Sequence, residues 1–158
     1  MRVTIRFAKP NDAEAIAALL RSAFAEFERL YTPAAFKATT PSADEIVERF
    51  AEGPIWIAEL AGAIVGTVSA ILQTSEVYIR SMAVSPSLRG SGIGAQLLQA
   101  VDALATEHQC RRLLLNTTPF LFAAIRLYER YGFRYTGEEP DLFGTKLLTM
   151  LKDLNARD

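Results

Sequence analysis

The sequence contains very little cysteine and histidine, the residues that most often build disulfides and transition-metal sites. Cys110 and His108 are the single representatives of these two types among 158 residues. One cysteine cannot form an internal disulfide, and its place ahead of an apolar run favours a buried, inert thiol. His108 is expected near the end of a helix, where capping or surface exposure is commoner than catalysis. We therefore predict no metal site, and a reducing compartment fits the cysteine content.

An excess of charge of either sign is also absent. The chain has 17 Lys and Arg residues against 18 Asp and Glu residues, which gives a formal net charge of −1 at pH 7. Nucleic-acid binding usually needs a concentrated basic face. We therefore expect no nucleic-acid partner, and any anion site must be local.

No run of residues is long and apolar enough for a membrane span. The longest weakly polar run covers residues 61–72, and residues 1–12 contain no apolar core of a signal peptide. A membrane-spanning helix needs about 20 apolar residues. We therefore expect a cytoplasmic protein without a membrane partner.

Length and composition indicate one ordinary globular domain. Hydrophobic residues make up 50% of the chain and charged residues 22%, and Gly and Pro are not in excess. Such a chain is long enough to bury a core without help from metals or disulfides. Repeats and linkers are not apparent, so we expect residues 1–158 to form a single domain.

Hydrophobic periodicity predicts a mixed α/β sheet. Some segments alternate apolar and polar residues as half-buried strands do, and others repeat apolar residues at helical spacing. Strands are expected at residues 3–7, 55–60, 63–72, 76–84, 113–115, 133–136 and 142–152, and helices at residues 11–30, 42–53, 93–105 and 118–131. Residues 31–41 are rich in turn formers and are expected to form a loop. In the resulting order, β-α-α-β-β-β-α-β-α-β-β, a right-handed crossover would make the strands on either side of the third helix parallel.

A glycine-rich loop precedes this third helix. Residues 89–94 are Arg-Gly-Ser-Gly-Ile-Gly. Glycines let a backbone approach a ligand closely, and the unpaired N–H groups and dipole of a helix N-terminus attract anions. The loop is therefore either a diphosphate site, to which Arg89 adds a fixed positive charge, or a tight turn with Arg89 in solvent.

The same loop also satisfies the dinucleotide-binding fingerprint of Rossmann domains. Gly90, Gly92 and Ala95 have the spacing G-x-G-x-x-A. That fingerprint directly follows its strand, and an acidic residue is expected near the end of the next strand. Here residues 85–89 intervene and the next strand ends in Asn116. This context argues against an oxidoreductase that binds a nicotinamide cofactor.

Two motifs at the expected separation resemble the GNAT acetyltransferase superfamily. Arg89-x-x-Gly92-x-Gly94 matches its Q/R-x-x-G-x-G/A signature and follows a strand that ends in Met-Ala-Val-Ser-Pro at residues 82–86. Residues 124–133 resemble the A-x-x-L-Y…G-F segment that closes the cofactor core of the family. The strong match covers residues 77–133. It implies a single GNAT-like domain in which the two central parallel strands splay apart.

The resemblance further implies an acetyl-CoA site without a metal. In such a site the loop amides hold the pyrophosphate, Arg89 lies at the entrance, and main-chain groups of the preceding strand pair with the pantetheine arm. Asn116 ends the second splayed strand and has either a polar role in the gap or a structural role in a turn. The expected cofactor-binding residues are Met82, Ala83, Val84, Arg89, Gly90, Ser91, Gly92, Ile93, Gly94 and Asn116. Many relatives carry Asn where this chain has Leu121, so one cofactor contact of the family is in doubt.

Tyr128 and Glu76 are the candidate catalytic residues. A leaving thiolate needs a proton, and a phenol with a pKa of about 10 can protonate a thiolate with a pKa of about 8.5. The resemblance favours this acid role for Tyr128 over that of a core aromatic residue, and a backbone N–H near Met82 would stabilise the oxyanion. Glu76 lies two residues before Tyr78 on the same strand. It is either a base that acts through water or a solvated charge at the strand end.

Together these features predict an N-acetyltransferase that moves the acetyl group of acetyl-CoA to a primary amine of a small molecule, peptide or protein. The alternative is an acyl-CoA-binding module without catalysis. The acidic loop at residues 138–141 would favour a cationic amine, or would simply face water. Four aromatic residues form either an acceptor wall or part of the core: Phe24, Phe27, Tyr31 and Phe36. A homodimer is compatible with this prediction.

Overall fold

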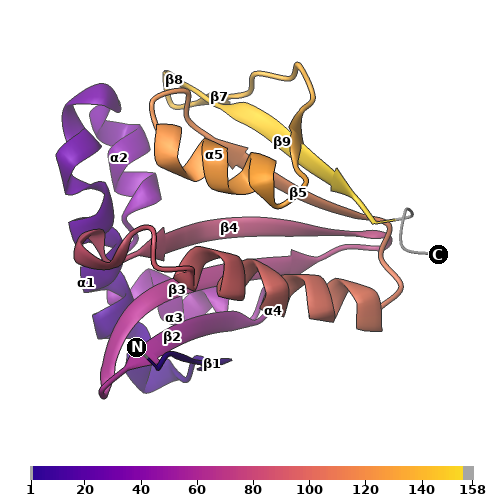
Figure 1. Ribbon diagram of the computed structural model, residues 1–158. Helices are drawn as coiled ribbons and strands as arrows, with labels where there is room; N and C mark the ends of the chain where they lie inside the picture. The colour runs from indigo at the N-terminus through magenta and orange to yellow at the C-terminus, as the bar shows by residue number, and fades with distance from the viewer. Residues whose placement is uncertain (1, 155–158) are drawn as a thin grey trace.

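The computed structural model describes residues 2–154, which form a seven-stranded sheet between two layers of helices (Figure 1). The strands of this sheet are β1 (Thr4–Phe7), β2 (Ile55–Leu60), β3 (Ala63–Leu72), β4 (Glu76–Val84), β5 (Arg112–Thr117), β6 (Arg134–Tyr135) and β9 (Leu148–Asp153). Their spatial order is β1-β2-β3-β4-β5-β9-β6, and only β4 and β5 are parallel neighbours. A separate hairpin contains β7 (Asp141–Leu142) and β8 (Thr145–Lys146). The predicted mixed sheet is thereby confirmed.

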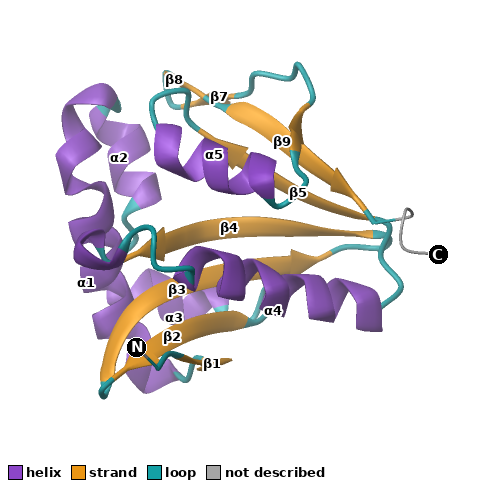
Figure 2. Cartoon of the chain, in the orientation of Figure 1, coloured by secondary structure: helices purple, strands orange, loops and turns teal. Residues whose placement is uncertain are grey.

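The helices divide between the two faces of the sheet (Figure 2). They are α1 (Ala13–Phe24), α2 (Pro33–Thr39), α3 (Ala43–Arg49), α4 (Ile93–Glu107) and α5 (Phe122–Arg130), and short 3-10 helices cover Pro10–Asp12, Ala25–Leu30 and Pro86–Leu88. One core contains α4 and α5 residues with Trp56 and Ala58, and the other contains α1 and α3 residues with Ile57. Successive residues of β2 belong to different cores, because the side chains of a strand point alternately to the two faces of the sheet. In the described part of the chain, no helix has the length and apolar character needed to cross a membrane.

The helix α2 lies within residues 31–41, where a loop was predicted, so that prediction is wrong. Thr32 caps this helix, because its Oγ1 accepts a hydrogen bond from the Ala35 N–H at 3.2 Å, and Pro33 occupies the first turn. Both are ordinary helix-start signals. Composition alone did not reveal this helix start, because Thr and Pro are also common in turns.

Other predicted boundaries differ from the observed ones in three places. The helix expected over residues 11–30 is α-helical only to Phe24 and continues as a 3-10 helix. The helix α5 begins at Phe122, four residues after the expected start. The segment 142–152 is divided among β7, β8 and β9, because Phe143 and Gly144 have left-handed φ angles of 47° and 96° and turn the chain.

A capping box starts α3. The Ser42 Oγ accepts a hydrogen bond from the Glu45 N–H at 3.2 Å, and the Glu45 carboxylate accepts one from the Ser42 N–H at 3.0 Å. These two bonds satisfy N–H groups that have no partner within the helix. They fix the start of a short helix whose last residue, Arg49, reaches the centre of the molecule.

The parallel strands β4 and β5 separate halfway along their length. Their pairing runs from Glu76 opposite Arg112 to Ile79 opposite Leu115 and then stops. Beyond that point β4 stays paired only with β3, and β5 only with β9. The β3 pairing of β4 is itself irregular, because Ser81 and its neighbour stand opposite one residue in a β-bulge, and Ser81 has a φ of 55°. The splayed strands implied by the two motifs are thus present.

A substitution in the turn between α3 and β2 can test how tightly α3 is held against the sheet. A Cβ added at Gly53 would lie 2.1 Å from the Ala70 carbonyl oxygen, which belongs to the backbone of β3. Because this oxygen cannot move aside cheaply, we predict that Gly53→Ala lowers the free energy of unfolding by at least about 2 kcal/mol in urea denaturation. The control is Gly137→Ala, where φ is 93° and the added Cβ meets nothing within 4 Å. There the backbone penalty alone predicts a loss of about 1 kcal/mol, and an equal loss at both sites would contradict the packing argument.

Candidate active site

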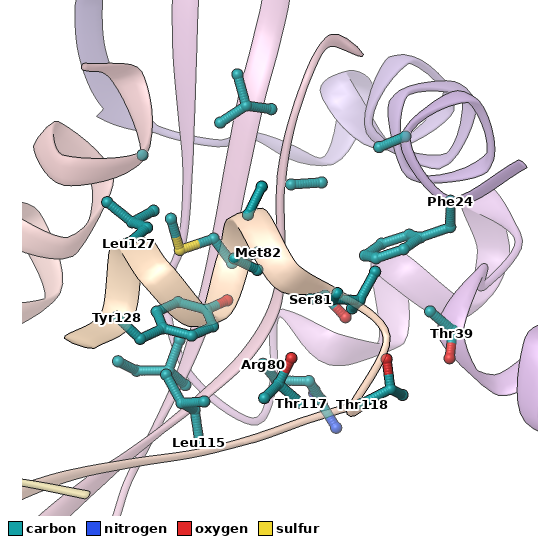
Figure 3. A pocket seen from close by; sticks show the side chains of 18 of the residues that line it. Phe24, Thr39, Arg80, Ser81, Met82, Leu115, Thr117, Thr118, Leu127 and Tyr128 are labelled. Carbon is teal, nitrogen blue, oxygen red and sulfur yellow. The ribbon is translucent and has the colours of Figure 1, made fainter. Parts of the chain in front are cut away.

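A cavity of about 750 Å³ lies where β4 and β5 separate (Figure 3). Residues 78–84 of β4 and 115–117 of β5 line it, together with the loop before α4, one side of α5 and the end of α1. In Figure 3 Tyr128 and Leu127 lie on one side of the cavity and Phe24 and Thr39 on the other. The cavity therefore brings together segments from both halves of the chain.

The glycines of the loop meet two different requirements. Gly90 and Gly92 have φ angles of 80° and 90°, and a Cβ at either would meet nothing within 4 Å, so their backbone borders open space in the cavity. Gly94 is a packing position, because a Cβ there would lie 2.6 Å from the Leu127 Cδ2. The loop thus exposes its backbone, and α4 begins close against α5. The side chain of Ser91 donates a hydrogen bond to the Leu88 carbonyl, and Ser91 does not line the cavity.

Arg89 lines the cavity but is already engaged by the N-terminal segment. Its guanidinium donates hydrogen bonds to the Glu26 carboxylate and, at 2.8 Å, to the Ala23 carbonyl oxygen. It also lies 5.9 Å from the centre of the Phe27 ring. These contacts join the glycine loop to the end of α1, and a role of Arg89 in cofactor binding stays a prediction.

The second half of β4 offers an unpaired strand edge to the cavity. Met82, Ala83 and Val84 all line it, and none has a partner on β5. The Met82 side chain also approaches Gly94, since its Cε would lie 3.2 Å from an added Cβ. Backbone N–H and C=O groups need hydrogen-bond partners. A ligand with amide groups in an extended arm can supply them as another strand would.

Tyr128 is a buried phenol at the inner end of the cavity. Its exposed fraction is 7%, and its ring packs edge-on against Phe133 with 5.8 Å between centres. Figure 3 shows its oxygen directed toward the space beside Met82. Burial, and to a smaller extent Tyr31, raises the pKa of Tyr128 well above its ordinary value of 10.0. The hydroxyl is therefore protonated at neutral pH, as a proton donor must be.

Asn116 is held between three strands. Its Nδ2 donates to the Tyr78 Oη at 3.2 Å, and its Oδ1 accepts from the Thr149 Oγ1 at 2.7 Å. These bonds join β4, β5 and β9 at the place where β4 and β5 part. Asn116 and Tyr78 both line the cavity, so the structural and ligand-facing roles expected for Asn116 are compatible.

The structure does not bring Glu76 to the cavity. Glu76 lies at the paired end of β4 opposite Arg112, and its carboxylate forms an ion pair with the Arg112 Nε at 3.3 Å. No aspartate or glutamate is among the described residues that line the cavity. A base role for Glu76, through water or directly, thus finds no support in the fold, because the strand carries it to the opposite end from Met82.

The acidic loop 138–141 is likewise engaged elsewhere. Glu139 accepts a hydrogen bond from the Tyr135 hydroxyl at 2.6 Å and pairs with Lys146, and Asp141 accepts one from the Gly144 N–H at 3.0 Å. None of these residues lines the cavity. The local hairpin thus accounts for this charge cluster, and an acidic acceptor rim is not formed.

The aromatic residues of the N-terminal segment form part of the cavity wall. Phe24, Phe27 and Tyr31 line it. Phe36 packs behind Tyr31, with 5.8 Å between ring centres, and Phe120 packs against Tyr31 at 4.9 Å. Three of the four residues thus belong to the cavity wall and Phe36 packs behind it, and a role in acceptor binding stays a prediction.

Sequence reasoning missed several lining residues, among them Arg49, Arg80 and Ser81 near the bulge. Arg49 at the end of α3 donates a hydrogen bond from Nη1 to the Ser81 Oγ at 2.7 Å, and Arg80 precedes Ser81 on β4. An arginine two residues before the Met-Ala-Val segment was a usable signal for Arg80. Nothing local indicates that Arg49, more than thirty residues earlier, meets the bulge at Ser81.

Comparison with known proteins agrees with this site. Residues 16–133 match the model of the acetyltransferase (GNAT) family. The uncharacterized N-acetyltransferase YjgM of Escherichia coli is 32% identical over 131 residues, which are 79% of this chain and 78% of that protein. The chain belongs to the GNAT family of N-acetyltransferases.

Two further comparisons concern a longer relative and the fold. The N-acetylaspartate synthetase of Danio rerio is 38% identical over 88 residues, and the match covers 54% of this chain but only 31% of that protein. The PaiA N-acetyltransferase of Thermoplasma acidophilum, solved in complex with coenzyme A, superposes with a TM-score of 0.82 at 15% identity and covers 97% of this chain and 99% of its own. The latter likeness supports the GNAT fold of this chain.

The burial of Tyr128 predicts an unusual titration. At pH 10.0 an ordinary phenol is half ionised, whereas the raised pKa keeps Tyr128 protonated there. We therefore expect wild type and Tyr128→Phe to show the same tyrosinate absorbance at pH 10 while both are folded. The unfolded proteins should differ by one titrating phenol under the same conditions. A lower absorbance of the folded variant at pH 10 would show that the Tyr128 hydroxyl titrates normally.

Proposed function

We propose that this protein transfers the acetyl group of acetyl-CoA to the primary amine of a small molecule or peptide, with the reaction centre between Met82 and Tyr128. One observation carries the proposal. A single cavity connects the glycine loop at the start of α4, the unpaired edge of β4 and the buried phenol of Tyr128. These are the three features that a thioester substrate with a diphosphate at its other end requires.

The loop and strand fit acetyl-CoA in shape and chemistry. The backbone at Gly90 and Gly92 borders space that a Cβ would occupy, and the amides ahead of α4 suit a diphosphate. Val84 and Met82 extend from this loop toward the bulge with a free strand edge, which suits the amides of a pantetheine arm. An extended arm that follows β4 in this direction ends beside Ser81 and Tyr128.

The bulge supplies a donor for the developing oxyanion. Attack of the amine nitrogen on the thioester carbon moves charge to the carbonyl oxygen as the new C–N bond forms. Around Ser81 and Met82 the pairing with β3 is broken, so a backbone N–H at this place is available to the site. A fixed donor of this kind stabilises the tetrahedral intermediate more than it stabilises the planar thioester.

Tyr128 supplies the proton for the leaving group. Collapse of the intermediate breaks the C–S bond and releases a thiolate, which takes the hydroxyl proton of Tyr128. The raised pKa of Tyr128 keeps this proton in place before the bond breaks, and because it also makes the phenol a weaker acid, the transfer depends on the thiolate forming within hydrogen-bond reach. The attacking nitrogen loses one proton as it becomes an amide, and this proton returns to Tyr128 directly or through solvent, so the proton balance closes.

Deprotonation of the acceptor amine is assigned to water. No carboxylate lines the described part of the cavity, but Arg49 and Arg80 do. Positive charges nearby disfavour an ammonium group and lower its pKa, which raises the fraction of neutral amine. A binding module without turnover has less support, because such a module would not need a protonated phenol beside the free edge of β4.

The glycine loop gives a direct test of the acetyl-CoA site. An aspartate at position 92 would place a negative charge in the open space beside the loop and strain a φ of 90°. We predict that Gly92→Asp weakens acetyl-CoA binding by about 100-fold or more in calorimetry, since like charges oppose the diphosphate. Gly62→Asp is the matched control, because Gly62 has a φ of 82°, is equally open and lies outside the cavity. Equal acetyl-CoA affinities of the two variants would show that the loop does not belong to the acetyl-CoA site.

The acid role predicts a selective kinetic defect at position 128. Tyr128→Phe keeps the ring and removes only the hydroxyl, so kcat should fall by about 10²- to 10⁴-fold while acetyl-CoA affinity changes little. In wild type the raised pKa of Tyr128 predicts activity that rises with pH as the amine deprotonates and does not fall as the pH approaches 10. Release of the CoA thiol measures both the kcat of the variant and the pH dependence of the wild type. A variant with unchanged kcat would show that solvent protonates the thiolate.

A further inference from the structure

The charge of the cavity wall is entirely of one sign. Five of the described lining residues are arginines and none is acidic. They are Arg49, Arg80, Arg89, Arg126 and Arg130. Arg89 is bound to Glu26 and Arg80 to Glu52, so the five arginines of the wall outnumber the neighbouring carboxylates that pair with them.

Two of these arginines flank the bulge, on the side away from the glycine loop. Arg80 directly precedes Ser81, and Arg49 donates to the Ser81 Oγ at 2.7 Å. Val84 lies four positions after Arg80 along the strand, a rise of roughly 13 Å, and the loop begins beyond Val84. A diphosphate on the loop is therefore too far away to neutralise this pair.

The acidic groups near the pair compensate it only in part. Glu52 accepts a hydrogen bond from the Arg80 Nη2 at 2.8 Å, and Glu45 is occupied by its capping bonds with Ser42. Burial, and next the charge of Arg80, lowers the pKa of Arg49. Glu52 is thus bonded to Arg80 and not to Arg49, and Arg49 is held where its charge is disfavoured.

Arg80 also has a hydrogen-bond donor for which the cavity wall provides no acceptor. Its Nε is buried, and no atom of residues 2–154 accepts a hydrogen bond from it. Buried donors without acceptors are rare in proteins, because each costs free energy. Beside it, Ser81 adds a hydroxyl group to the same part of the wall (Figure 3), and its oxygen accepts the hydrogen bond from Arg49. An anionic group with several oxygens matches this set of donors.

We propose that the acceptor is an amine that carries a carboxylate, and that Arg49 and Arg80 bind this carboxylate while the amine faces the thioester near Met82. This inference rests on the proposed acetyl transfer and adds the class of acceptor. The carboxylate offsets the buried positive charge and orients the nitrogen toward the reaction centre. Free amino acids are the simplest compounds of this class.

The test compares matched acceptors that differ only in charge. The twenty standard amino acids and their carboxamides are each assayed with acetyl-CoA by thiol release, and polyamines and uncharged alkylamines serve as further acceptors. We expect kcat/KM to be highest for an amino acid and lower by about 30-fold or more for its carboxamide. A preference for carboxamides, polyamines or alkylamines overturns the proposal.

Arginine variants assign the effect to the pair. Arg49→Gln and Arg80→Gln should each lower kcat/KM for the preferred amino acid by about 30-fold or more, mainly through KM, and change the value for its carboxamide by much less. Acetyl-CoA affinity should stay the same. Arg21→Gln, which alters an exposed arginine of α1 outside the cavity, is the control and should behave as wild type. Equal losses on the amino acid and its carboxamide would show that the arginines do not bind the carboxylate.

A binding measurement separates this proposal from the transfer reaction. N-acetyl amino acids are titrated by calorimetry into protein saturated with CoA. Binding of at least one, weakened about tenfold or more in Arg80→Gln, supports the carboxylate site even if turnover is absent. If none binds, the carboxylate proposal fails, while acetyl-CoA binding and turnover of another amine would leave the proposed function standing.

Discussion

The early end of the pairing between β4 and β5 is the constraint on which the rest of the site depends. Parallel neighbours normally satisfy each other's backbone groups along their full length, and an unsatisfied buried group costs about 1–3 kcal/mol. Here the two strands pair over four residues and then turn to different partners. The bulge at Ser81 bends β4 away, and Tyr128 from α5 enters the space. The fold thus leaves a strand edge open beside a phenol.

Contacts between distant segments enclose this opening. Thr32 donates from its Oγ1 to the Phe143 carbonyl at 2.8 Å and from its N–H to the Thr145 Oγ1 at 2.9 Å, which binds the start of α2 to the β7–β8 hairpin. On the other side, Arg89 binds Glu26 and the end of α1. The cavity wall is therefore a joint product of the N-terminal helices and the C-terminal hairpin. Acceptor recognition in the proposed reaction would depend on both.

The electrostatics of the cavity divide into two regions with different roles in the proposed reaction. Near the glycine loop, backbone amides and the start of α4 provide partial positive charge. Near the bulge, Arg49 and Arg80 provide whole charges that the wall does not balance. Tyr128 lies between them as the one strongly perturbed acid, kept neutral by burial. This arrangement separates anion binding at both ends from proton transfer in the middle.

Local sequence patterns determined much of this protein: the strands and helices, the capping box at Ser42, the glycine loop and the position of Tyr128 beside a cofactor core. These features depend on residues close together in the chain, where periodicity, capping and turn chemistry act directly. Local patterns also misled, since Thr32 and Pro33 looked like part of a turn, and they left open whether Glu76 is a base or a charge at the strand end.

Tertiary structure alone decided which side chains share the cavity. Arg49 meets Ser81 because α3 packs across the bulge, and Glu76 is excluded because β4 carries it to the paired end of the strand. Both outcomes depend on strand register and helix packing between residues far apart in sequence, whose energies are set by the whole core and not by any local pattern.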